Sequence, residues 1–261
     1  MDIHLSHSDT RLNDKLLGIF FKVETLHWWW VARKKIVLNL LDKHLNSKNK
    51  NLILDAGCGT GAGMIYLSKF GKVYGVDLSP IAVRFCRKRG IKNVKVGSVL
   101  RLPYKDNTFD LICLMDVIEH IKDDKKVIEE MHRVLKPGGL LLMTLPALPF
   151  IYSKHDSEQG HYRRYTKNDI KKLFKKNRFA EKKLTYFNLF LSSPIILIRL
   201  LSRVGWPFTG LASFDSKVNY SIHNKKIINL LLTKIFSFES ILINNFDLPF
   251  GISLLSLHEK I

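Results

Sequence analysis

Short apolar runs alternate with segments of helical period over most of the chain. Seven runs have the length of strands, and apolar residues at helical spacing separate most of them. The expected strands are 52–56, 72–77, 93–97, 109–115, 140–145, 180–187 and 251–259, with helices from the first strand to residue 70 and at 80–89, 123–135 and 169–176. Strands that alternate with helices form right-handed βαβ units. The expected fold class is therefore α/β, a doubly wound, Rossmann-like parallel sheet covered on both faces.

Two regions depart from this alternation. Residues 1–50 have an amphipathic, helical pattern and carry the aromatic and basic stretch HWWWVARKK. Residues 188–247 hold apolar runs of helical length with interspersed Lys and Arg. We therefore expect an N-terminal helical cap (1–50), a core (51–187), a helical insertion (188–247) and a final strand that belongs to the core sheet (248–261).

The composition is that of a globular chain with an excess of positive charge. Of the 261 residues 46% are hydrophobic, which is enough for a packed core, and the formal net charge is +19. A basic surface attracts nucleic acid, anionic lipid or acidic small molecules. The alternative is that Lys is simply the default surface residue, because the basic residues are spread along the chain. Both interpretations stay open.

Cysteine usage and the absence of targeting signals favour a cytoplasmic location. The three cysteines have no C-x-x-C spacing, which indicates buried reduced thiols and no metal site. The N-terminal stretch MDIHLSHSDTRLND is polar and does not resemble a signal peptide. We expect no apolar run of the ~18 residues that a membrane span requires.

The run LILDAGCGTGAG at 52–63 ends a buried strand in a glycine-rich turn. Gly57, Gly59 and Gly61 allow a tight turn and close approach of the backbone to a ligand, and the next helix presents free N–H groups. Asp77 follows at the end of the second strand, where a carboxylate can accept hydrogen bonds from ribose hydroxyls. Because Ala62 fits the last slot of the dinucleotide fingerprint, spacing alone leaves a nicotinamide cofactor open.

Five stretches in order add specificity: LDAGCGTG, VYGVDLS, LPYKDNTFDLI, DVIEHI and LKPGGLLLMTLP. Together they resemble the motif set of class I S-adenosyl-L-methionine (SAM) dependent methyltransferases over about residues 50–190. The resemblance implies a seven-stranded sheet with an antiparallel last strand and SAM as the cofactor. It also implies that Asp55 organises the loop near the SAM amino group. The residues implied to line the methionine part are Gly57, Gly59 and Gly61, and Cys58 between them is a further expected cofactor-binding residue.

The resemblance extends to the rest of the cofactor site. Asp77 would bind the ribose hydroxyls, and Leu78 would flank the adenine. Ser98 and Val99 stand where many family members carry an acidic residue, and Ser98 can still hydrogen-bond the adenine edge. Arg33, in a helix that also resembles one methyltransferase subgroup, would lie near the SAM carboxylate.

Polar residues follow the fourth strand, at the sheet edge where open α/β folds bind ligands. The resemblance places Met115 and Asp116 beside SAM. His120, with an ordinary pKa near ~6.5, can take a proton from the acceptor. Glu119 points to the same edge. An open alternative is that DVIEH serves helix capping and packing.

The segment KHDSEQGHYRRYTKNDI (154–170) concentrates reactive side chains after the fifth strand. His161 or His155 can act as the base, with Asp156 orienting the ring, and paired arginines bind phosphate or carboxylate. The expected substrate-binding residues are Arg163, Arg164 and Tyr165. GHYRRY resembles a GHxRRY element of a methyltransferase subgroup linked to lipid, quinone or surface-glycan metabolism. The alternative is a structural loop whose arginines pair with helix ends or with Asp156.

The insertion suggests contact with a membrane. Residues 189–201 are apolar, Arg199 and Arg203 stand near the end, and Trp206-Pro207-Phe208 follows. This fits an interfacial helix on anionic lipid, with Ile195 and Ile196 as contact residues, although a lid or a homodimer contact fits as well.

The function that these patterns favour is methyl transfer from SAM to a small-molecule, lipid-linked or glycan acceptor, with a histidine as general base. The protein would be cytoplasmic, with peripheral contact at the inner face of the membrane as an option. An RNA or protein methyltransferase is the second choice, which brings nucleic acid in as a partner. A nicotinamide-dependent oxidoreductase and a non-catalytic binding module rank below it.

Overall fold

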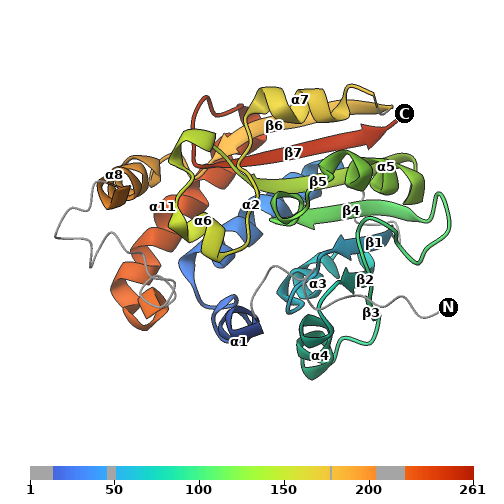
Figure 1. Ribbon diagram of the computed structural model, residues 1–261, viewed down its shortest axis with the longest axis horizontal. Helices are drawn as coiled ribbons and strands as arrows, with labels where there is room; N and C mark the ends of the chain where they lie inside the picture. The colour runs from blue at the N-terminus through green and yellow to red at the C-terminus, as the bar shows by residue number, and fades with distance from the viewer. Residues whose placement is uncertain (1–13, 46–50, 177, 204–220) are drawn as a thin grey trace.

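One seven-stranded sheet in the order β3-β2-β1-β4-β5-β7-β6 forms the centre of the molecule (Figure 1). The computed structural model describes residues 14–45, 51–176, 178–203 and 221–261. The strands are β1 (Asn51–Ala56), β2 (Gly71–Asp77), β3 (Val94–Val96), β4 (Phe109–Met115), β5 (Leu135–Pro146), β6 (Phe179–Phe187) and β7 (Ser253–Lys260). β7 runs antiparallel to its neighbours β5 and β6, and the other pairs are parallel. The predicted α/β, Rossmann-like fold with an antiparallel last strand is confirmed.

Helices flank the sheet along its length. They are α1 (Asp14–Val23), α2 (Trp28–His44), α3 (Ala62–Leu67), α4 (Pro80–Lys88), α5 (Asp124–Val134), α6 (Lys154–Glu158), α7 (Lys167–Phe174), α8 (Ser192–Arg203) and α11 (Lys226–Asn245), with short 3-10 segments η2 (Ile118–His120), η3 (Pro149–Ile151) and η4 (Ile222–Asn224). The division of the chain into 1–50, 51–187, 188–247 and 248–261 stays a prediction, although β7 does complete the core sheet.

Two element boundaries differ from the sequence prediction. β5 begins at Leu135 rather than at residue 140, because Leu135 already pairs with Phe109, and a register shift after Phe109 accommodates the Pro-Gly-Gly segment. Residues 147–168, for which the sequence predicts neither a strand nor a helix, contain α6. This short helix begins at a capping box, in which the side chains of Ser153 and Asp156 each bond the other residue's backbone N–H.

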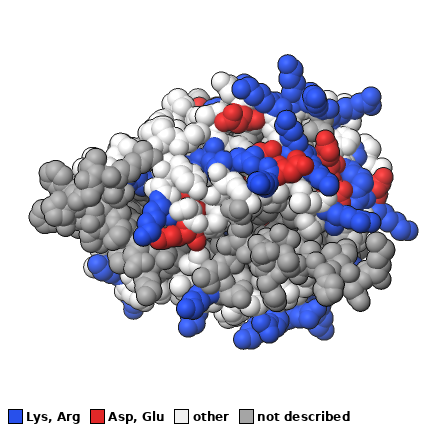
Figure 2. Space-filling view, viewed as in Figure 1, with Lys and Arg blue, Asp and Glu red and all other residues white. Residues whose placement is uncertain are grey.

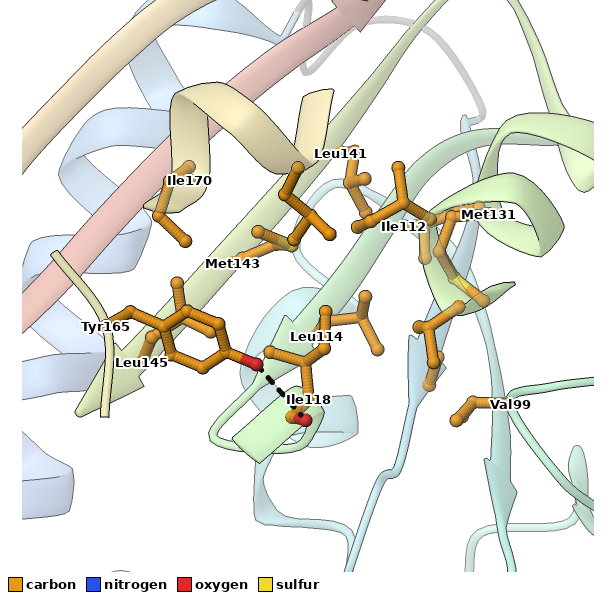
Figure 3. Close-up of a cluster of buried hydrophobic side chains, with 14 of the residues drawn as sticks. Val99, Ile112, Leu114, Ile118, Met131, Leu141, Met143, Leu145, Tyr165 and Ile170 are labelled. Atoms are coloured by element: carbon orange, nitrogen blue, oxygen red, sulfur yellow. Dashed lines mark hydrogen bonds between the residues drawn. The ribbon is translucent and has the colours of Figure 1, made fainter. Parts of the chain in front are cut away.

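Both faces of the sheet are buried. Toward α5 and α7, one apolar cluster includes Ile112, Leu114, Leu141, Met143, Met131 and Ile170 (Figure 3). The second cluster lies against α2, α3, α4 and α11, and there Trp28 and Trp29 pack on Phe236. Because both faces are covered, functional side chains have to come from the carboxyl ends of the strands.

α11 corrects the expectation that no apolar run reaches the length of a membrane span. Lys226–Asn245 has 20 residues and a hydropathy of 1.5, and by length and composition alone it is long and apolar enough to cross a membrane. Lys234 and Glu239 interrupt the apolar run in the sequence, although both residues belong to this one continuous helix. In the fold, Phe236, Ser240 and Ile243 of α11 are buried, and Asn39 of α2 donates a hydrogen bond to Ser240.

Candidate active site

A cavity of about 1640 Å³ opens at the carboxyl ends of β1, β2, β4 and β5. It exceeds the ~300–1,000 Å³ of a pocket for one small ligand, so it has room for a cofactor and a second molecule. Side chains of α2 and α8 complete the wall opposite the sheet. Predicted residues that line it include Asp55, Gly57, Cys58, Gly59, Asp77, Leu78, Ser98, Val99, Met115, Asp116, Arg33, His120, His155, Asp156, His161 and Arg164.

The glycine loop after β1 adopts a conformation that other residues rarely take. Gly57, Gly59 and Gly61 have φ values of 77°, 53° and 90°. A Cβ on Gly57 would lie 2.6 Å from a methyl carbon of Val117, so the backbone is packed directly against the segment after β4. Gly61 is not among the residues that line the cavity; it is the N-cap of α3 and closes the loop against Cys86.

Asp77 stands where a ribose-binding carboxylate is expected. One of its oxygens accepts from the backbone N–H of Gly59 at 2.8 Å and the other from Ser79 at 2.9 Å. Burial raises the pKa of Asp77. Since an ionised carboxylate has about four acceptor sites, two remain for hydroxyl groups of a ligand. Asp77 therefore fits a ribose.

Ser98, Val99 and Cys58 meet the cavity in different ways. The Ser98 hydroxyl accepts from the backbone N–H of Leu100 at 3.2 Å and keeps its own proton for a ligand. The Val99 side chain is buried in the core cluster. The Cys58 sulfur lies 3.9 Å from that of Cys86, so the thiol is turned toward α4, and the backbone is the part of Cys58 that can meet a cofactor.

Asp55 and Arg33 form the polar floor between the cofactor loop and β4. Burial raises the pKa of Asp55 to about 7 against the opposing charge of Arg33, and its Oδ2 has no hydrogen-bond partner among the described residues. Arg33 forms an ion pair with Asp116, which also accepts from Thr144 at 3.1 Å. The buried Nε of Arg33 has no partner in the described part of the chain. An acceptor and a donor therefore remain for the amino and carboxylate groups of an amino-acid moiety.

The segment after β5 is organised around Asp156. This carboxylate is fully buried and accepts from Arg164 at 2.8 Å, from Arg199 at 2.8 Å and from the backbone of Ser153 at 2.9 Å. It also lies 3.3 Å from Nδ1 of His161. Burial alone would raise the pKa of Asp156, but the bond to His161 and the guanidinium charges hold it well below its ordinary value.

Arg163 and Tyr165, predicted to bind the substrate, are not among the residues that line the cavity, and their role stays a prediction. Arg163 turns away from the cavity and binds Asp124 at 2.8 Å and the Lys122 carbonyl at 2.7 Å. Tyr165 inserts into the core, where its hydroxyl lies 3.4 Å from the Ile118 carbonyl (Figure 3). The guanidinium of Arg164 reaches the cavity but is committed to Asp156 and to the Ala147 carbonyl. Their polar character serves the scaffold beneath the site.

The three predicted histidines occupy different environments. His120 and His161 meet edge to face, with ring centroids 4.7 Å apart, on the cavity wall next to Glu119. Burial and the charge of Arg199 lower the pKa of His155 to about 4, so this imidazole is neutral near pH 7 and a weak base. His161 is the histidine that a carboxylate orients.

Sequence reasoning missed two contributors to the site. Glu24 lies at the cavity, accepts from the Thr60 hydroxyl and pairs with Arg89 at 2.6 Å. Arg199 of α8 reaches across to Asp156. Neither has a signal in the sequence, because each depends on a contact between segments far apart in the chain.

The fold and the site together agree with a SAM-binding methyltransferase domain of the class I type. Residues 54–143 match the family described as a methyltransferase domain and form that domain of the chain. The free acceptor positions at Asp77 and Asp55 and the close backbone approach at Gly57 fit SAM.

Known proteins resemble part of this chain in sequence. Norajmaline N-methyltransferase of Rauvolfia serpentina is 38% identical over 106 residues, which are 37% of this chain and 36% of that protein. Demethylmenaquinone methyltransferase of Geobacillus stearothermophilus is 32% identical over 120 residues, 42% and 51% of the two chains. The chain thus spans about half or less of these relatives.

A solved complex between the Haloferax volcanii Trm112 methyltransferase activator and a methyltransferase aligns with 94% of this chain and 94% of the matched chain. The TM-score is 0.61 at 16% identity, which supports the fold alone.

Proposed function

We propose that the protein transfers a methyl group from SAM to a small-molecule acceptor held beside Asp116. The observation that carries the proposal is that one cavity joins the glycine loop and Asp77 to a wall of Glu119, His120 and His161. SAM supplies a methyl group already activated as a sulfonium. The chain then has to position the acceptor, exclude water and take up the acceptor's proton.

His161 is the best-placed proton acceptor. Asp156 holds its Nδ1, which leaves Nε2 for the cavity, and Asp156 acts as a positioning residue. The Tyr152 hydroxyl donates to the His161 carbonyl at 2.8 Å and fixes the backbone of this residue. A general base contributes ~10²–10⁴-fold to a rate, and this is the loss expected for His161→Gln.

The rest of the wall suits an acceptor with an apolar body. Side chains of α2, α8 and α11 and of the residue before α8 line it, among them Trp28, Leu191, Ile195, Ile198 and Leu232. The two curated relatives are named for methylation of an alkaloid and of a quinone precursor, and this favours a small molecule over RNA or protein. The match to a methyltransferase domain and the features of the site favour SAM over a nicotinamide cofactor.

We further propose peripheral contact with anionic lipid, through which a lipid-linked acceptor would arrive from the cytoplasmic side. Apolar residues of α11 stand exposed along one stripe: Ile227, Leu231, Ile235, Phe238 and Ile241. Lys225, Lys226 and Lys234 flank this stripe. On α8, Leu197 and Leu200 are exposed. Ile195 and Ile196 are partly buried against the core, and the lipid contact predicted for them stays a prediction. Arg203 and Trp206-Pro207-Phe208 lie outside the described side chains.

If the protein were an RNA methyltransferase, we would expect one contiguous basic surface around the cavity. Figure 2 shows Lys and Arg in several separate groups on the viewed face, with acidic side chains among them. This view gives no support to the nucleic-acid alternative.

Methyl transfer from labelled SAM to fractionated lipid, quinone, glycan and RNA pools tests the first proposal. We expect label in a small-molecule or lipid fraction and at least a hundredfold less with His161→Gln, in line with the loss of a general base. Label in RNA alone would overturn the assignment of the acceptor.

Co-sedimentation with phosphatidylcholine vesicles, with and without phosphatidylglycerol, tests the lipid contact. Binding should need the anionic lipid, and Leu231→Asp with Phe238→Asp should abolish it. The matched control is Ile261→Asp, an exposed apolar residue at the far end of the chain, which should bind as the wild type does. Equal binding by all variants would contradict the proposed surface.

A further inference from the structure

Glu119 carries a buried carboxyl group to which no other described residue donates a hydrogen bond. Its side chain is 0% exposed, and neither oxygen has a hydrogen-bond partner from another described residue. Buried carboxylates in proteins are normally paired, hydrogen-bonded or bound to a metal, because removing one from water is costly.

Two imidazoles face this carboxylate. One ligand atom each from Glu119, His120 and His161 can be chosen so that all three lie within 4.8 Å of one another. The backbone brings them together across forty residues, since the N–H of Tyr162 donates to the Glu119 carbonyl at 2.8 Å. This backbone hydrogen bond joins η2 to the segment before α7 and so helps to assemble the cluster.

A second layer of side chains orients one of these imidazoles. Asp156 holds Nδ1 of His161, and Arg164 and Arg199 hold Asp156. Histidines that bind metals commonly give their other ring nitrogen to a carboxylate in this way, which fixes the ring and its tautomer. All three members of the cluster also line the cavity, so an ion there would keep a side open to a further ligand.

We propose that Glu119, His120 and His161 bind one divalent transition-metal ion, and that its open side takes the hydroxyl oxygen of the acceptor. Two imidazoles and one carboxylate suit Zn²⁺, Mn²⁺ or Fe²⁺ better than Mg²⁺ or Ca²⁺, which prefer oxygen ligands. The expectation of no metal site rested on cysteine spacing, and this donor set contains no cysteine.

The inference rests on the proposed function and assigns it an acceptor class, an alcohol or a phenol. A bound ion lowers the pKa of the hydroxyl, whose proton leaves to solvent. The oxygen lone pair forms the new bond to the methyl carbon as the methyl–sulfur bond breaks, and the electrons of that bond remain on sulfur. With the ion present, His161 serves as a ligand and no longer needs to take the proton.

The test measures metal and SAM on the same full-length protein, purified without a metal-affinity step. After treatment with a chelator, the protein is titrated with Zn²⁺ by calorimetry and with Co²⁺ by visible absorption. We expect about one ion per chain and a Co²⁺ spectrum with nitrogen ligands. Glu119→Gln and His161→Gln should each lower metal affinity at least tenfold and leave SAM binding intact.

The matched control is His44→Gln, because His44 lies at the end of α2, outside the cavity. It should bind the metal as the wild type does. Wild-type protein that binds SAM but takes up no stoichiometric ion, or metal affinity equal in Glu119→Gln and wild type, would overturn the metal site and leave His161 as the base. Metal binding without SAM binding would instead refute the proposed methyl transfer.

Discussion

Two buried carboxyl groups lie near His161, and they differ in their hydrogen-bond partners and in the direction of their pKa shifts. Asp156 accepts hydrogen bonds from Arg164, Arg199 and Ser153. The bond to His161 and the charges of the two arginines hold its pKa well below the ordinary value, against the effect of burial. Glu119 has no hydrogen-bond partner from another described residue, and burial raises its pKa well above the ordinary value. Asp156 therefore belongs to an ion-pair network within the chain, whereas the described residues offer Glu119 no hydrogen-bond partner.

This difference separates scaffold from site. A buried charge whose donors are all supplied by the chain holds segments in place, and here it joins α6, α8 and the segment before α7. A buried carboxyl group without donors is costly, and at Glu119 the proposed metal ion would supply the missing partner. The stretch that looks richest in chemistry, GHYRRY, therefore contributes mainly scaffold, whereas Glu119 comes from a motif that could equally have been a helix cap.

Substitutions at the neighbouring residues Arg163 and Arg164 test this difference most clearly. Arg164→Met removes a buried partner of Asp156 and strands the Ala147 carbonyl, which should lower the free energy of unfolding by about 3–5 kcal/mol. Arg163→Met breaks a half-exposed pair with Asp124 and should cost about 1 kcal/mol or less. Urea unfolding of both variants checks this, and equal losses would contradict the assignment of Arg164 to the scaffold.

Asp55 allows the same contrast to be tested by pH. Its pKa of about 7 in the fold, against 3.8 normally, means that the folded state binds the proton more tightly. Burial of the Asp55 carboxyl group therefore leaves the free energy of unfolding unchanged below pH ~4. Between pH ~4 and pH ~7 it lowers the free energy of unfolding increasingly, and above pH ~7 the loss is constant, at most about 4 kcal/mol. Asp55→Asn should remove this pH dependence and raise the free energy of unfolding at pH 8. An unchanged profile between pH 4 and pH 8 would show that Asp55 is compensated.

The glycine loop provides a smaller effect. Gly57→Ala should weaken SAM binding at least about tenfold, ~1.4 kcal/mol, because the added Cβ meets Val117 at a φ of 77°. Gly90→Ala is the control, since φ is 81° there but the space is open. It should cost stability and leave the calorimetric affinity for SAM unchanged. Equal affinities in the two variants would mean that backbone approach at Gly57 plays no part in binding.

The sequence predicts the sheet and the cofactor half of the site well, because both are local. Strands alternate with helices, and Gly57 and Asp77 sit at ends of strands that any βαβ unit brings together. The acceptor half depends on contacts across long stretches of chain, such as Arg199 with Asp156 and Tyr162 with Glu119. No periodicity encodes these contacts. For the same reason, the sequence could not tell that Tyr165 turns into the core.

The most direct test makes the same chemical change at both carboxylates in chelator-treated protein. Asp156→Asn leaves Arg164 and Arg199 without their anion and should lower the free energy of unfolding by about 3 kcal/mol. Glu119→Gln removes the acid whose ionisation burial disfavours and should raise the free energy of unfolding at pH 8. Opposite signs in urea unfolding would support the division between scaffold and site. A loss of stability in both variants would contradict it, because Glu119 would then have partners within the chain.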